Sequence, residues 1–418
     1  MRANTLRVED VAQTAVGDPA EQALKALLGG SHEAVLAPDD LLRSNGAFPD
    51  VLISWSRSIG VATQLFNRGY RHQQRFAVLP SRARARWLLP QSPGLAAGFE
   101  LYTPFSTGAR LLKALLTKVR ATGWQGWARH RVLIASQKPL ALEALACEVT
   151  GVKQVAFAVS LGTPGLFQKL TVQVMSCDGR ILCYAKLPLT ARANKRLEHE
   201  ARVLQALQRF PNLRPRIPRL LYAGTETGGY VLMQARLEGK PGPARFLPIH
   251  GEFLKSLHEC DSSMVPGRNV VREVAREWDG VAPRMETRLQ TLGRDALRVA
   301  ARELDGSQVL CGISHGDFAP WNTRVHRSEL CLFDWESSRI DAPCVWDQFH
   351  FLAQTESLLS VKHPVRGVAD VRLRNRSLYL LYLLHSTAQL LDEQAAEGSI
   401  SYRERQLSRH LTEATPVK

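Results

Sequence analysis

The hydrophobic and polar positions after residue 150 fall into two successive patterns. First come short runs typical of β-strands, "QVAFAVSLG", "KLTVQVMS" and "RILCYAKL". The Asp-Gly pair in "CDGR" (177–180) separates the last two runs and predicts a tight hairpin turn. After residue 245 the apolar spacing is mostly helical. Strands followed by helices predict an α+β architecture with two lobes.

The first 150 residues do not follow this order, and we expect them to add an α/β module. Residues 1–50 are predicted to be partly helical or flexible, and 51–150 to form a basic module. The strand-rich lobe is then expected to cover 151–236, and the helical lobe 237–418.

Three local patterns predict elements within this N-terminal part. "VGDPAEQALKALLGG" has the punctuation of a helix, with Pro19 at its start and Gly29 after its end. "GARLLKALLTKVRATG" (108–123) predicts a second helix from its apolar stripe. In "LPSRARARWLLP" the basic residues alternate, so a strand would place them on one face: Arg82, Arg84 and Arg86.

The net charge of +15 is concentrated in one stretch of the chain. Residues 51–138 hold 14 Lys and Arg against a single acid, Glu100, which is a net charge of +13. Such asymmetry predicts an anionic surface or polyanion as the partner of this stretch, with solvated or internally paired arginines as the alternative. The stretch contains no recognised nucleic-acid-binding motif.

Cysteine usage and hydropathy indicate a reducing, aqueous compartment. The seven cysteines form no C-x-x-C pair, which argues against a zinc site or a disulfide framework. The apolar run "LYLLYLL" (378–384) is far shorter than the roughly 20 residues of a membrane span, so we expect no transmembrane segment. The N-terminus does not resemble a signal peptide. We therefore expect a cytoplasmic protein, with peripheral membrane association as an alternative.

Two features of the strand-rich lobe could bind phosphate groups. "SLGTPG" contains Ser160, Gly162 and Gly165, and its glycines would let backbone N–H groups approach phosphate oxygens. Lys186 closes an apolar strand, from which a flexible ammonium could reach the same phosphates. The alternatives are a plain hairpin turn and a strand-edge lysine. Glu200, on the helix that follows, is the expected ion-pair partner of Lys186, with Glu198 as the rival.

Two further motifs place oxygen ligands at the ends of strand-like segments. In "SHGDFAPWNTRV", Asp317 could accept the proton of an attacking hydroxyl, and Asn322 could return around a tight loop to Mg²⁺. Asp334 in "CLFDWESS" offers a carboxylate to the same metal. Two ordinary turns are the alternative. We expect His315 to hold the loop by packing and hydrogen bonding, and the motif tryptophans to line the core.

These motifs resemble those of the aminoglycoside phosphotransferase/choline kinase family. That family has H-G-D-x-x-x-x-N, then a hydrophobic strand that leads into D-W/F-E, as in "SHGDFAPWN" and "LFDWES" here. The resemblance covers roughly residues 150–400 and implies the two-lobed protein-kinase-like fold. By resemblance, Asp317 is the catalytic base, and Asn322 and Asp334 are the metal ligands.

The resemblance also assigns roles in the rest of the chain. It implies that Lys186 binds phosphate, and that backbone at Met233 and Ala235, in "YVLMQARLEGKPG", meets adenine. Asp347 in "APCVWDQFHFLAQ" is implied to steady the catalytic region without taking part in chemistry. His258 in "FLKSLHEC" is implied to be structural.

The combined reading is an ATP- and Mg²⁺-dependent phosphotransferase that acts on a hydroxyl of a small molecule or saccharide. The basic chain argues against a polycationic aminoglycoside as acceptor, since that ligand would be expected to meet an acidic pocket. Two alternatives are a non-catalytic kinase-like nucleotide-binding or regulatory protein and a basic protein that binds nucleic acid or a membrane surface.

Overall fold

The computed structural model describes most of the chain, and it divides into two compact units. Described are residues 19–28, 34–36, 50–55, 59–91, 98, 100, 101, 111, 113, 114, 117, 118, 129–226, 229–361, 370–393 and 397–412. The first unit comprises Met1–Ala201 and Arg219–Arg236, and the second comprises Arg202–Pro218 and Leu237–Lys418. Each unit is considered separately below.

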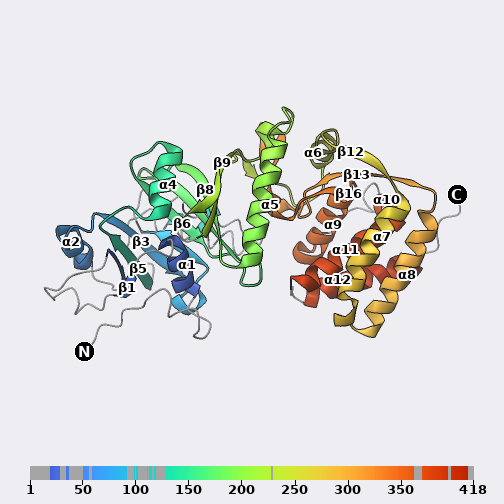
Figure 1. The fold of residues 1–418 in the computed structure, drawn as a ribbon, viewed down its shortest axis with the longest axis horizontal. Coiled ribbons are helices and arrows are strands. Elements are labelled where there is room, and N and C mark those ends of the chain that lie inside the picture. Colours follow the sequence, from blue (N-terminus) through green and yellow to red (C-terminus); the bar gives the residue numbers. More distant parts are fainter. Residues whose placement is uncertain are drawn as a thin grey trace. The chain divides into compact units, whose positions relative to one another are not determined.

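A ten-stranded sheet organises the described part of the first unit (Figure 1). Its strand order is β1-β2-β5-β3-β4-β6-β7-β8-β10-β9. Every neighbouring pair is antiparallel except β1 and β2. The strands are β1 (Ala34–Leu36), β2 (Val51–Ser54), β3 (His72–Leu79), β4 (Trp87–Pro90), β5 (His130–Ser136), β6 (Val155–Ser160), β7 (Lys169–Ser176), β8 (Ile181–Pro188), β9 (Leu220–Glu226) and β10 (Gly229–Ala235).

A short pairing between β4 and β6 makes this sheet continuous. Trp87 lies opposite Ser160, and Leu88 lies opposite Val159. The strands before residue 150 therefore belong to the same sheet as the strands after it. The sheet is also the reason why "QVAFAVSLG" is apolar at nearly every position, because both faces of β6 are covered.

The described helices of the first unit supply much of that cover. They are α1 (Pro19–Leu28), α2 (Ile59–Asn67), α4 (Ala141–Thr150) and α5 (Ala191–Leu207), the last of which continues into the second unit. Leucines of α1 and α4 join Val155, Phe157 and Val159 in one core cluster. Ala156 and Ala158, on the other face of β6, pack with Leu89 in a second cluster.

Local predictions in this unit had different outcomes. The hairpin at 177–180 is confirmed, because Gly179 has φ +90° and the Ser176 N–H donates to the Arg180 carbonyl at 2.9 Å. The first helix begins at Pro19 as predicted, whereas Gly29 lies outside the described residues. Most of the helix predicted over 108–123 also lies outside them.

The strand expected for the alternating arginines is wrong. Arg82–Arg84 form a 3₁₀ turn, η3, in the loop that joins β3 to β4. The chain reverses there, and the Arg86 N–H donates to the Leu79 carbonyl at 2.7 Å. Pro80 cannot donate a strand hydrogen bond, so β3 ends just before it and the arginines fall in the turn.

The second unit is mostly helical, with two small sheets (Figure 1). One sheet has the order β11-β14-β15 and the other β12-β13-β16. The strands are β11 (Lys240–Pro241), β12 (Ser262–Pro266), β13 (Gln308–Ser314), β14 (Thr323–His326), β15 (Glu329–Leu332) and β16 (Arg339–Pro343). The described helices are α6 (Pro248–His258), α7 (Gly267–Val281), α8 (Thr287–Glu303), α9 (Trp346–Leu359), α10 (Asp370–Arg374), α11 (Arg376–Asp392) and α12 (Glu397–Thr412).

Helix α11 forms the centre of this unit. Its segment "LYLLYLL" is buried almost all round, as expected for a helix that is apolar on every side. Helices α7 and α8 approach each other closely, since a Cβ at Gly293 would lie 2.1 Å from the Trp278 ring. Among the described helices, none is both long and apolar enough to cross a membrane. The predicted α+β class is confirmed, with an antiparallel sheet in one unit and a helical second unit.

Candidate functional site

The loop after β13 carries the first candidate motif and depends on a glycine. Strand β13 ends at Ser314, and the chain then turns through His315, Gly316 and Asp317. Gly316 has φ +76°, and a Cβ there would lie 2.1 Å from the Ser337 carbonyl oxygen. Any other residue would therefore force the loop away from Ser337.

The carboxylate of Asp347, in the first turn of α9, anchors this loop. It accepts hydrogen bonds from the Ser314 hydroxyl at 2.9 Å and from two backbone N–H groups, of His315 at 2.7 Å and Gly316 at 3.0 Å. Its side chain is buried. The bonds to the loop match the steadying role that the resemblance implied.

His315 is held in place by hydrogen bonds and packing. It is fully buried, and its Nε2 lies 3.0 Å from the Phe333 carbonyl oxygen, to which it donates. Its Nδ1 accepts the Asp317 N–H at 3.2 Å. Both ring nitrogens are therefore engaged, and the ring also packs against Trp335 at 4.7 Å. The expectation that His315 holds the loop is confirmed.

Asp317 and Asn322 are brought into direct contact by this loop. The Asn322 amide nitrogen donates to the Asp317 carboxylate at 2.8 Å and to its backbone carbonyl at 2.9 Å. Asn322 is buried in the turn η8 (Pro320–Asn322), whereas one third of the Asp317 side chain stays exposed. Each carboxylate oxygen has two lone pairs, so Asp317 can still accept a proton from a further group.

His350 is the residue of this site that the sequence reasoning missed. Its Nε2 lies 3.0 Å from Asp317 Oδ1, and the Gln354 side-chain amide lies 3.1 Å from the same nitrogen. The Tyr382 hydroxyl is 3.3 Å from its Nδ1. His350 follows Asp347 by three residues on α9, so the two share a helix face. That spacing was the available signal.

Asp334 follows β15 and lies close to Asn322 along the hairpin of β14 and β15. Thr323 pairs with Leu332, and the Phe333 N–H donates to the Asn322 carbonyl at 3.0 Å. Asp334 itself has φ +71°, a backbone conformation that is uncommon outside glycine. The side-chain N–H groups of Asn322 donate hydrogen bonds to Asp317. The Asn322 Oδ1 atom is therefore the side-chain atom that could coordinate a cation. An amide oxygen and a carboxylate suit Mg²⁺.

In the first unit, the predicted pairing of Lys186 is confirmed. Its ammonium lies 2.6 and 2.7 Å from the two carboxylate oxygens of Glu200. Both side chains are almost completely buried. The rival Glu198 instead accepts from Asn194 at 2.6 Å. The apolar stripe of α5 explains the choice, because it turns Glu200 inward.

The glycine-containing loop between β6 and β7 is tied to the loop before β4. Gly162 has φ +65°, and a Cβ there would lie 2.6 Å from the Lys169 carbonyl oxygen, so this position requires glycine. Gly165 also has positive φ, and Ser160 closes β6. The Arg86 guanidinium donates to the Gly162 carbonyl at 3.0 Å. A phosphate-binding role for this loop stays a prediction.

Met233 and Ala235 lie at the end of β10. Met233 is fully buried between β8 and β9, and the Ala235 N–H donates to the Arg219 carbonyl at 2.8 Å. That N–H is therefore used within the unit. Contact of this backbone with adenine stays a prediction.

Burial affects the protonation of two histidines in the second unit. Burial lowers the pKa of His250 to about 4, and the ring packs against Phe246, Phe318 and Phe351. Burial also lowers the pKa of His258, which the negative charge of Asp347 partly offsets. The His250 ring packs on Phe318, the residue after Asp317, and the structural role implied for His258 stays a prediction.

Comparison with known protein families supports a phosphotransferase. Residues 168–345 match the model of the phosphotransferase enzyme family, APH. The resemblance inferred from the motifs is thereby confirmed. The match supports a phosphotransferase. No curated protein sequence matches the chain.

Solved structures with a similar arrangement include several aminoglycoside phosphotransferases. The apo form of a thermostable mutant of aminoglycoside phosphotransferase APH(4)-Ia is 15% identical, with a TM-score of 0.48; the match covers 66% of this chain and 100% of that one. The GDP complex of wild-type aminoglycoside 2'-phosphotransferase-IIIa is also 15% identical, with a TM-score of 0.44; the match covers 66% of this chain and 99% of that one.

Proposed function

We propose that this protein transfers the γ-phosphoryl group of ATP to a hydroxyl group of a small molecule or saccharide. The observation that carries the proposal is Asp317, a partly exposed carboxylate whose two oxygens contact Asn322 and His350. A carboxylate oriented in this way suits a general base for a hydroxyl. The family match over residues 168–345 supports the reaction class.

In this proposal Asp317 accepts the proton of the acceptor hydroxyl as the oxygen–phosphorus bond forms. Asn322 and His350 restrict rotation of the carboxylate, so that a lone pair stays directed toward the accessible side. Asn322 Oδ1 and the Asp334 carboxylate would hold Mg²⁺, which when bound neutralises phosphate charge. Lys186 would bind phosphate oxygens, and Glu200 would keep its ammonium in place.

The acceptor is proposed to be neutral or anionic, because the chain has a net charge of +15. A polycationic acceptor would gain little from such a molecule. We still propose that the basic stretch 51–138 binds an anionic partner. Arg82 is already engaged within the unit. Arg82 pairs with Glu21 and stacks over Trp55 at 4.2 Å.

The test is Mg·ATP-dependent phosphorylation of a fractionated pool of small metabolites, followed with the parent and with Asp317→Asn. General-base assistance typically contributes about 10²–10⁴-fold, so the variant should lose transfer by about that factor. Circular dichroism of both proteins checks that the fold is kept. Transfer within a few-fold of the parent would show that Asp317 is not the base.

The same experiment separates the main alternative, a kinase-like protein that binds nucleotide without catalysis. Binding of ATP with no ADP release from any metabolite fraction would favour that alternative. Neither outcome depends on knowing the acceptor in advance.

A further inference from the structure

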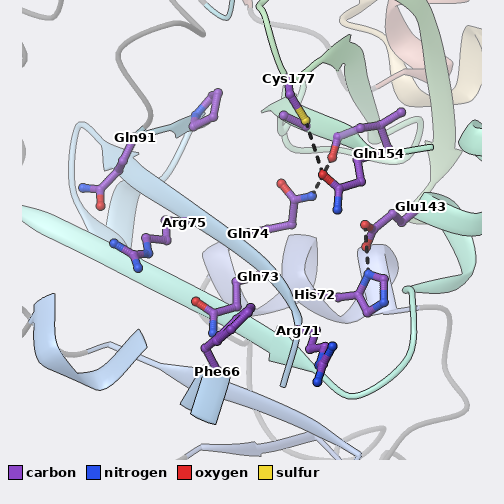
Figure 2. A pocket seen from close by; sticks show the side chains of 13 residues that line it. Phe66, Arg71, His72, Gln73, Gln74, Arg75, Gln91, Glu143, Gln154 and Cys177 are labelled. Atoms are coloured by element: carbon purple, nitrogen blue, oxygen red, sulfur yellow. Dashed lines mark hydrogen bonds and ion pairs between the residues drawn. The ribbon is translucent and has the colours of Figure 1, made fainter. Parts of the chain in front are cut away.

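A polar cavity of about 440 Å³ lies in the first unit, outside every residue assigned above to phosphate transfer (Figure 2). It is lined by Phe66, Arg71, His72, Gln73, Gln74, Arg75, Pro90, Gln91, Glu143, Gln154, Val155, Ala156 and Cys177. Its volume falls in the range of roughly 300–1,000 Å³ that is typical of small-molecule sites.

The cavity exists because β4 is shorter than the strands on either side of it. Strand β4 pairs with β3 only along Phe76–Leu79 and with β6 only at Val159 and Ser160. Beyond Pro90, β3 and β6 continue without a described strand between them. The Gln74 amide reaches across this gap and donates to the Val155 carbonyl at 2.9 Å. This hydrogen bond fixes the separation of β3 and β6 at the cavity.

This position is remote from the glycine loop on the same strands. The cavity lies at the Val155 end of β6, whereas the loop begins at Ser160. Five residues of strand span about 16 Å. A ligand in the cavity would therefore occupy a site separate from that loop.

Within the described part of the chain, the lining holds two buried polar side-chain atoms that have no hydrogen-bond partner. Glu143 is 5% exposed, and its Oε1 lies 3.3 Å from His72 Nδ1, but its Oε2 has no hydrogen bond. The Gln91 side-chain nitrogen is likewise buried without an acceptor. A buried polar atom without a partner is costly, so a bound molecule that supplies a donor to Glu143 and an acceptor to Gln91 would be stabilised.

The remaining lining groups define the chemistry of that molecule. Arg75 is exposed at the cavity, lies on the same side of Gln74 as Gln91 (Figure 2) and makes no ion pair with a described residue, so it can receive an anionic group. The glutamine amides both donate and accept, as hydroxyl groups do. Phe66 adds an aromatic ring that is 53% exposed. In Figure 2, Arg75 and Gln91 lie on one side of Gln74, and His72 and Glu143 lie on the other.

We propose that this cavity binds an anionic monosaccharide, held by its phosphate or carboxylate group on Arg75 and by its hydroxyl groups on Gln91, Glu143 and the other amides. The two anionic groups present the same chemistry to the guanidinium, namely paired oxygens that accept charge-assisted hydrogen bonds. The site is independent of the proposed phosphotransfer, since it uses none of its residues.

Isothermal titration of the full chain with glucose 6-phosphate, glucuronate and glucose tests the proposal. We expect saturable binding of at least one of the two anionic sugars, and binding of glucose at least tenfold weaker. Whichever of glucose 6-phosphate and glucuronate binds more tightly shows whether the site prefers a phosphate or a carboxylate group. Arg75→Ala should weaken that binding by about tenfold or more, because it removes a charge-assisted hydrogen bond. Glu143→Gln should weaken it several-fold.

Arg84→Ala is the matched control, since Arg84 is an exposed arginine of the same unit that does not line the cavity. It should bind like the parent. Because Arg75 is exposed, its variant is expected to fold, and thermal unfolding verifies this. Absence of binding by both anionic sugars would show that the cavity is not a site for an anionic monosaccharide. That result, equal binding of glucose, or unchanged binding by Arg75→Ala would each overturn the proposal.

Discussion

The ion pair of Lys186 with Glu200 and the carboxylate of Asp317 are held in opposite ways. Lys186 and Glu200 form an ion pair with side chains that are 4% and 0% exposed. Asp317 is one third exposed, and its carboxylate contacts an amide and an imidazole. A buried pair neutralises its own charge, whereas Asp317 keeps its charge available to a substrate. The first arrangement suits fixed positioning, and the second suits proton transfer.

The largest effect that distinguishes these arrangements is expected for Glu200→Ala. The variant removes the carboxylate that pairs with the buried Lys186 ammonium, which should lower the free energy of unfolding by about 3–5 kcal/mol. Urea denaturation followed by circular dichroism measures this. Glu198→Ala on the same helix is the control and should cost about 1 kcal/mol or less. Equal losses for the two variants would contradict the buried-pair interpretation.

The free energy of unfolding should decrease at acidic pH because of the buried His250. The pKa of His250 is about 4 in the folded protein because of burial, against about 6.5 when unfolded. Between these values the unfolded chain binds more protons, so stability falls as pH decreases from about 6.5 to about 4, by up to about 3 kcal/mol. Its full contribution is present above pH 6.5.

The variant His250→Gln isolates this contribution, because an amide can accept the Leu247 N–H as His250 Nδ1 does, at 2.9 Å, but does not titrate. Denaturation of parent and variant across pH 4–7 gives the difference. Two stability curves that remain parallel over this range would show that His250 does not supply the acid sensitivity.

The smallest effect is expected at His350. His350→Ala should reduce kcat by about tenfold with KM little changed, since it removes one contact that orients the Asp317 carboxylate. His350→Gln retains an amide donor and should recover most of the loss. His326→Ala, on β14, is the control. If the glutamine variant were as slow as the alanine variant, orientation by a donor would not be the role of His350.

Local patterns were sufficient where the relevant contact lies close in sequence. The five-residue spacing between Asp317 and Asn322 placed both in one tight loop, and they are in contact. The stripe along α5 distinguished Glu200 from Glu198. In both cases a single turn or helix decides which side chains can meet.

Contacts that depend on tertiary packing were beyond such reasoning. His350 meets Asp317 from a helix 33 positions later; its three-residue spacing from Asp347 indicates a shared helix face but does not specify the contact with Asp317. The alternation of Arg82, Arg84 and Arg86 resembled one face of a strand, but Pro80 ended β3 before it. The pairing of β4 with β6 joins residues more than 70 positions apart, and hydrophobic patterning does not specify such registers.

The join between β4 and β6 has a consequence for solubility. A fragment that began at residue 151 would lose β4 together with α1 and α4, which cover β6. Its first strand would then present a bare apolar ribbon, "VAFAVS", with backbone donors and acceptors open along one side. Such a ribbon is a template for adding strands from other molecules. We therefore expect such a fragment to self-associate more readily than the full chain.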